Sequence, residues 1–168
     1  MTGRIRAALG AADAWVRRAE MAALGTLMAA LTTITFLQVL MRYVFNDPLT
    51  WSEEAARYLF VWVSLVGAGA AVGRGAHYGM ETLQHRLPAG LHRWCGGAAM
   101  LVVLAFAVAL LMTGVQESVL AARQLSWSMP IRMHWAYAAL PVGAALMLWH
   151  IGMLWLRHGF GRHPLDRD

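Results

Sequence analysis

Four long stretches of this chain contain no Asp, Glu, Lys or Arg. They are Met21–Met41, Tyr58–Gly73, Trp94–Gln116 and Met133–Leu156. A helix needs about 20 mostly apolar residues to cross a bilayer, and three of the stretches have that length alone. The second is shorter, but a helix that begins near residue 50 is long enough. The pattern predicts an all-α membrane protein with four transmembrane helices, at about 21–41, 50–73, 94–116 and 133–156.

Composition agrees with a membrane protein. Charged residues make up 14% of the chain, against about 25% in soluble domains. This excludes a soluble enzyme domain, a disordered chain and a nucleic-acid-binding protein. The segments between the stretches are short, so residues 1–168 are expected to form a single four-helix membrane domain. The only cysteine, Cys95, cannot form an internal disulfide.

The distribution of arginine predicts the orientation in the membrane. All 14 basic residues are Arg, and ten of them fall on one side of the four predicted spans, against four on the other. Cytoplasmic segments carry the excess of positive charge, so both termini are expected in the cytoplasm. Residues Met1–Glu20 lack the pattern of a cleaved signal peptide and are interpreted as an amphipathic lead-in to the first helix.

The segment from Arg42 to His77 carries the most specific polar pattern. Asp47 and Pro48 resemble a helix start, with an acidic N-cap followed by proline at the first helical position. Glu53 and Glu54 then fall in the first turns, where the helix dipole favours negative charge. Arg57 lies four and three residues after them, so it can pair with either carboxylate.

Polar residues of the first span are expected to contact protein rather than lipid. Thr35, Gln38 and Arg42 follow one another at helical spacing on one side of that span. Arg42 could pair with Glu53 or Glu54, either as a clasp between the first two helices or as a charged gate, and the clasp is favoured because no acidic residue lies deep in a predicted span. Trp51 and Trp62 are interpreted as interface anchors or subunit contacts.

Small residues line the later part of the second span. Gly67, Gly69, Ala71 and Gly73 include a GxxxG pair and a second small-xxx-small pair. Such faces allow another helix to approach closely. These four positions are therefore predicted to pack against a helix of this chain or of another protein.

No catalytic, cofactor-binding or metal-binding residues are predicted. There is no nucleotide-binding or hydrolase motif. Within the uncharged stretches only His134 and His150 are histidines, and both lie in the fourth. A haem held between two helices needs a histidine on a second span, so a haem-binding electron-transfer subunit is a weak alternative. A small transporter or channel that works alone as a homo-oligomer is a second one.

The segment from Arg42 to His77 resembles the small membrane subunit, DctQ-like, of tripartite ATP-independent periplasmic (TRAP) transporters. Further similarity lies before and within the fourth span. The residues that carry the resemblance are Arg42, Tyr43, Phe45, Leu49, Trp51, Glu53, Glu54, Arg57, Phe60, Trp62, Gly67, Ala68, Ala71 and His77, with Met129, Pro130, Trp135, Tyr137, Pro141 and Gly143. The turn from Arg74 to His77 is less basic than the corresponding turn often is in relatives.

The resemblance implies a non-catalytic scaffold subunit in the bacterial inner membrane. Its partners would be a large multi-span permease, a periplasmic solute-binding protein and the bilayer, with no nucleic acid and no cofactor. The transporter would take up an organic acid, often a carboxylate, by symport with an ion, usually sodium. The substrate and sodium sites would belong to the large subunit.

Overall fold

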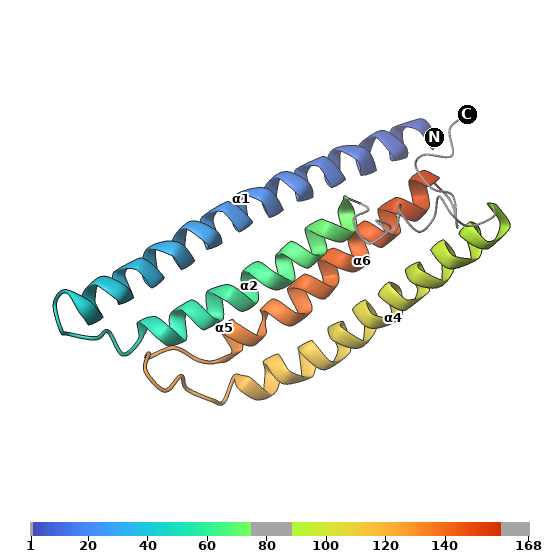
Figure 1. The fold of residues 1–168 in the computed structure, drawn as a ribbon. Coiled ribbons are helices and arrows are strands. Elements are labelled where there is room, and N and C mark those ends of the chain that lie inside the picture. The colour runs from blue at the N-terminus through green and yellow to red at the C-terminus, as the bar shows by residue number, and fades with distance from the viewer. Residues whose placement is uncertain (1, 75–88, 159–168) are drawn as a thin grey trace.

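The computed structural model describes residues 2–74 and 89–158, and these parts are almost entirely helical (Figure 1). The helices are α1 (Thr2–Tyr43), α2 (Ser52–Gly73), α4 (Ala89–Ala121), α5 (His134–Tyr137) and α6 (Ala139–His158). Four segments are long and apolar enough to cross a membrane: Ala7–Tyr43, Ser52–Gly73, Gly97–Ala121 and His134–Leu156. The predicted all-α fold with four membrane-spanning helices is confirmed.

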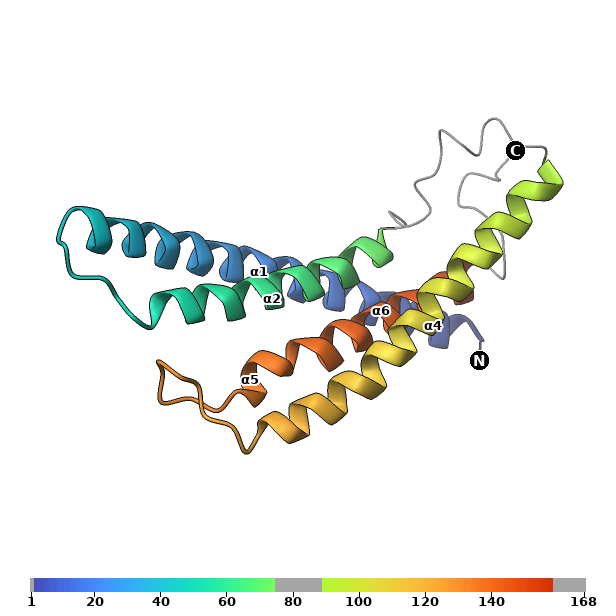
Figure 2. The same ribbon diagram turned by 60° about the horizontal axis from the view of Figure 1, so that its bottom comes forward.

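The helices pack in a row rather than as a closed bundle. α2 lies between α1 and α6, and α6 lies between α2 and α4, as the two views in Figures 1 and 2 show. The N-terminal end of α1 and the C-terminal end of α6 lie at the same end of the helices (Figure 1). Because each outer helix has one main neighbour, large apolar side chains such as Phe36 of α1 and Phe106 of α4 stay more than half exposed. In a bilayer, lipid or another protein would cover them.

Glycines set the close contact between α2 and α6. A Cβ atom added at Gly69 would lie 2.9 Å from Cβ of Leu146, and one added at Gly143 would lie 2.8 Å from Cβ of Leu65 and 3.0 Å from its carbonyl oxygen. Gly73 meets the ring of His150 in the same way. A Cβ atom added at Gly67 would instead lie 3.8 Å from Cδ2 of Leu24 on α1, while Ala71 is half-buried.

The first helix is longer than predicted. α1 runs without a break for 42 residues, about 63 Å at 1.5 Å per residue, which is about twice the hydrocarbon thickness of a bilayer. The lead-in Met1–Glu20, as far as it is described, continues the helix of the predicted span 21–41. Figure 1 shows α1 extending past the C-terminal end of α2.

The second helix begins later than predicted. Asp47 and Pro48 lie in the connecting loop, and the helical N-cap is Trp51, whose side chain forms no capping hydrogen bond. A tight turn takes the place of the first expected helical turn, since Ser52 donates to the carbonyl of Leu49 from both its backbone nitrogen (3.3 Å) and its hydroxyl (2.7 Å). The prediction of a helix start at Asp47–Pro48 is wrong for this reason.

The fourth span is interrupted near its start. α5 ends at Tyr137 and α6 begins at Ala139. Pro141 has no N–H to give to the carbonyl of Tyr137, four residues earlier, and its ring crowds that carbonyl. The segment therefore covers the predicted span 133–156 as two helices in succession.

We expect Gly143→Ala to destabilise the protein, because the added methyl group would meet backbone atoms of Leu65 that cannot move aside. Overpacking of this kind costs about 1–3 kcal/mol, which corresponds to a fall of about 2–10 °C in the thermal melting midpoint in mild detergent. Gly152→Ala is the matched control on the same helix, since nothing lies within 4 Å of its added Cβ. Equal midpoints for the two variants would contradict the close contact.

Candidate functional site

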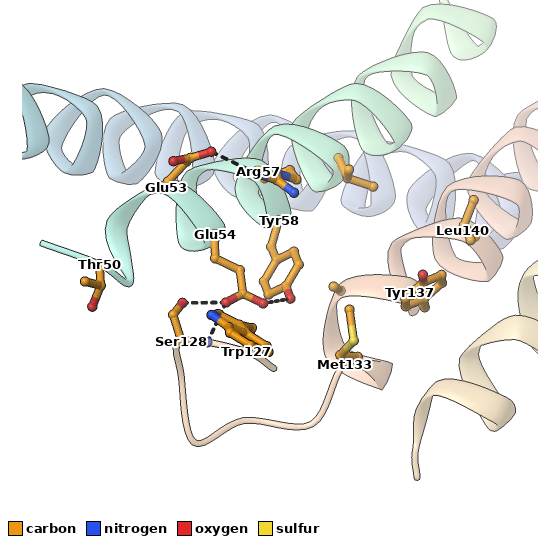
Figure 3. Close-up of a pocket in the computed structure, with 12 residues that line it drawn as sticks. Thr50, Glu53, Glu54, Arg57, Tyr58, Trp127, Ser128, Met133, Tyr137 and Leu140 are labelled. Carbon is orange, nitrogen blue, oxygen red and sulfur yellow. Dashed lines mark hydrogen bonds and ion pairs between the residues drawn. The ribbon is translucent and has the colours of Figure 1, made fainter. Parts of the chain in front are cut away.

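Glu54 is the centre of a polar contact at the end of the helices opposite the N-terminus of α1. Its carboxylate accepts a hydrogen bond from the backbone nitrogen of Ser128 at 2.9 Å, and others from the hydroxyls of Ser128 and Tyr58 (Figure 3). Tyr58 is four residues further along α2, whereas Ser128 lies 74 residues away, in the connection between α4 and α5. Glu54 therefore joins the start of α2 to that connection.

The connection between α4 and α5 is itself held in a hairpin-like shape. Ser126 donates from its backbone nitrogen to Ile131 at 2.9 Å, and Met133 donates to Gln124 at 3.0 Å. The hydroxyl of Ser126 also accepts from the backbone of Met129. These bonds project Ser128 toward Glu54, and they leave the side chain of Trp127 almost completely exposed.

A cavity of about 620 Å³ lies beside this contact, between α2 and the α5–α6 segment. The α2 wall carries charge and the opposite wall is mainly apolar, as Figure 3 shows. The lining residues are Thr50, Glu53, Glu54, Arg57, Tyr58, Val61, Trp127, Ser128, Met133, Ala136, Tyr137 and Leu140.

Glu53 and Arg57 form a separate, exposed ion pair within α2. Nη2 of Arg57 lies 3.1 Å from Oε1 of Glu53, at the four-residue spacing that the sequence indicates. Both side chains are about 70% exposed, so the pair contributes at most about 1 kcal/mol to stability. Figure 3 shows Glu53 and Glu54 pointing to different sides of the helix.

The expected pair between Arg42 and a carboxylate of α2 is not formed within the described residues. Arg42 is exposed and makes no ion pair within residues 2–74 and 89–158, where Glu53 pairs with Arg57 and Glu54 contacts Ser128. The physical reason is that α2 begins only at Ser52, and its two carboxylates find partners on α2 and on the α4–α5 connection. Thr35 is also exposed, with its hydroxyl bonded to the carbonyl of Leu31, and Gln38 is half-buried.

The two predicted tryptophan anchors have different surroundings. Trp62 donates from Nε1 to the backbone carbonyl of Trp135 at 3.0 Å, which links α2 to α5 within the chain. Trp51 is 36% exposed at the start of α2. His77 and the rest of the turn after Arg74 lie outside the described residues.

A second polar cluster lies at the opposite end of the helices, near the N-terminal part of α1. It was not predicted from the sequence. Asp13 and Glu20 of α1 and His150 of α6 are each less than 5% exposed. Nε2 of His150 lies 2.9 Å from Glu20, and Arg17 bonds both Asp13 at 2.9 Å and the terminal carbonyl of α2, at Gly73, at 2.7 Å. The spacing of residues 13, 17 and 20 on one helical face was the available signal.

Metal-ligating side chains (His, Cys, Asp or Glu) do not gather in threes or more in an arrangement that could hold a metal ion in the described residues. Both ring nitrogens of His150 face carboxylates, so neither is directed toward a haem.

The polar residues of α2 fall within a longer segment that matches a known protein family. Residues 31–158 match Tripartite ATP-independent periplasmic transporters, DctQ component. The chain belongs to this family. Proteins of this family are transporter components and not enzymes. With its four apolar helices, the chain is a multi-pass membrane protein.

Named relatives support the assignment. The C4-dicarboxylate TRAP transporter small permease protein DctQ of Vibrio cholerae is 40% identical over 84 residues, which is 50% of this chain and 36% of that protein. The sialic acid TRAP transporter small permease protein SiaQ of Vibrio cholerae is 32% identical over 122 residues, or 73% of this chain and 70% of that protein.

A third relative is a much longer chain. The sialic acid TRAP transporter permease protein SiaT of Haemophilus influenzae is 33% identical over 124 residues, which is 74% of this chain but 20% of that protein. The chain thus spans about a third of the DctQ relative and a fifth of the SiaT relative.

We expect Glu54→Gln to loosen the connection between α4 and α5, because the amide cannot accept from Ser128 and Tyr58 as strongly as a carboxylate does. Trypsin cleavage after Arg123 or Arg132, which flank Ser128, should become several-fold faster. Glu53→Gln is the matched control, since Glu53 contacts neither residue. Unchanged cleavage in Glu54→Gln would show that its contact does not hold the connection.

Proposed function

We propose that this chain is the small permease subunit of a TRAP transporter and acts as a non-catalytic membrane scaffold for a large permease. The family match carries the proposal. The row of helices supports it, because both outer helices present large apolar surfaces to whatever surrounds them. In this proposal residues 1–168 form one four-helix domain of the bacterial inner membrane, with both termini in the cytoplasm.

We assign the C-terminal half of α1 as the surface that contacts the large permease. Phe36 and Val39 are exposed there beside the polar residues Thr35 and Arg42, and Gln38 forms no side-chain hydrogen bond within the described parts of the chain. Polar side chains within a span are favoured against protein rather than lipid. The match to a fifth of the longer SiaT permease also favours direct association with a larger membrane partner.

The transport function that we propose is uptake of an organic acid delivered by a periplasmic solute-binding protein and driven by an ion gradient, with sodium as the ion. Two relatives are named for C4-dicarboxylates and sialic acid, which supports an acid as solute, although another is named for ectoine. The subunit itself would contribute support and not the solute site. This is consistent with polar contacts that join one part of the chain to another.

We expect the chain to co-purify with a large multi-span permease in mild detergent, and its deletion to abolish sodium-dependent uptake in the presence of the binding protein. Uptake in reconstituted vesicles containing both permease subunits measures the second effect. Recovery of the chain alone, together with normal uptake after its deletion, would contradict the scaffold role. Solute transport by the reconstituted chain alone would instead favour a homo-oligomeric transporter.

The double variant Phe36→Ala, Arg42→Ala should reduce recovery of the large permease several-fold, because it removes an apolar and a charged contact from the proposed surface on α1. The control is the double variant Phe106→Ala, Val119→Ala, which truncates exposed side chains of α4 at the other edge of the row. Loss of the partner in the control alone would place the contact on α4.

A further inference from the structure

The connection between α4 and α5, residues 122–133, has two faces of opposite character. Its side chains alternate between two sides, as they do in an extended chain. Ser126 and Ser128 lie on the side that faces the protein, where Ser126 is buried and Ser128 is hydrogen-bonded. Leu125 and Trp127 are 72% and 99% exposed. The hydroxyl groups therefore face the protein, and the large apolar side chains face away from it.

The contact with Glu54 fixes the depth at which this connection lies. Glu54 is the third residue of α2, which is one of the segments long and apolar enough to cross a membrane. Its carboxylate accepts from the backbone nitrogen of Ser128 at 2.9 Å. The connection is also joined to a span at each end, because one span ends at Ala121 and the next begins at His134. Trp127, next to Ser128, therefore lies level with the first turn of α2.

A bilayer offers a suitable medium at this depth. Tryptophan is enriched at the membrane–water interface, because its ring has an apolar body and a polar N–H group. Transfer of an exposed leucine from water into an apolar medium is also favourable. A connection with its hydroxyl groups turned inward and its apolar side chains turned outward matches the interface better than it matches water.

The charges of the connection match those of lipid headgroups. Residues 122–133 contain two arginines, Arg123 and Arg132, and no Asp or Glu. Both arginines are exposed. Arg132 donates from Nη1 to the carbonyl of Ala122 at 3.3 Å, and a guanidinium has five N–H groups, so others remain for a phosphate oxygen. Arginine side chains near the ends of spans reach toward the lipid phosphates in this way.

We propose that the connection between α4 and α5 binds the bilayer surface, with Leu125 and Trp127 inserted into the interfacial region. Arg123 and Arg132 bind phosphate groups of the phospholipids. Glu54 is a positioning residue, since it holds the polar face of the connection against α2. This surface is separate from the one assigned to the large permease on α1, and it adds a lipid contact to the proposed scaffold role.

The depth of residue 127 can be measured with a nitroxide label on the full chain in vesicles of phosphatidylethanolamine and phosphatidylglycerol. Trp127→Cys carries the label in a Cys95→Ser background, since Cys95 is the only native cysteine. Oxygen concentrates in the bilayer, so we expect its collisions with the label to exceed those of a water-soluble nickel chelate several-fold. The control label, at Asp47→Cys in the exposed connection between α1 and α2, should favour the chelate.

Two results of this measurement would overturn the proposal. A label at residue 127 that favours the nickel chelate, as at residue 47, would place the apolar face in water. A label shielded from both reagents would show that another protein chain covers the face in place of lipid.

The native side chain can be tested by fluorescence in the same vesicles. The emission that the native chain has and Trp127→Phe lacks belongs to Trp127. It should lose most of its intensity in phospholipid brominated at the headgroup end of the acyl chains, and little on addition of acrylamide to the water. The reverse pattern would contradict insertion of Trp127.

The polar residues are tested with the label at residue 127. Glu54→Gln should lower the ratio of oxygen to nickel collisions several-fold, because the connection is released from α2, whereas Glu53→Gln should leave it unchanged. The double variant Arg123→Gln, Arg132→Gln should lower the ratio as well, with Arg57→Gln as its control. An unchanged ratio in Glu54→Gln would refute its positioning role, and an unchanged ratio in the arginine variant would refute the phosphate contacts.

Discussion

The close contact between α2 and α6 is the one on which the positions of the other helices depend. In a bilayer there is little hydrophobic gain in bringing two apolar helices together, so association relies on close packing and on hydrogen bonds. Gly69 on one helix and Gly143 on the other remove the side chains that would keep the backbones apart. α1 then packs along α2, and α4 packs along α6.

Polar contacts fix the two ends of this central pair. At one end Glu54 joins the start of α2 to the α4–α5 connection through Ser128. At the other end Arg17 satisfies the terminal carbonyl of α2 and His150 joins α6 to α1. Hydrogen bonds and ion pairs are directional, so these contacts can define the register of helices whose apolar surfaces alone would allow sliding.

Local patterns in the sequence were enough for the helices and not for the contacts between them. The absence of charge in four stretches predicts the spans, and the four-residue spacing of Glu53 and Arg57 indicates a pair that the structure contains. The partner of Glu54 could not be predicted, because Ser128 is 74 residues away and its position depends on the shape of a loop. The start of α2 was missed since a turn at Leu49–Ser52 competes with the helical one.

The buried cluster was missed for a related reason. Asp13 and Glu20 lie in a segment that also carries four arginines, and an amphipathic surface helix explains that composition equally well. Only the length of α1, and its course past the end of α2, bring that face to His150. A charged residue before a predicted span is therefore not necessarily outside the packed part of a membrane protein.

The packing of the helices in a single row also affects how this protein can meet another. In a closed bundle most apolar side chains are used inside, so a partner finds only the remainder. Here the contact between α2 and α6 holds the row together. The broad surfaces on either side of the row do not take part in that contact. A partner could cover one of these surfaces, or move along it, without separating any pair of helices.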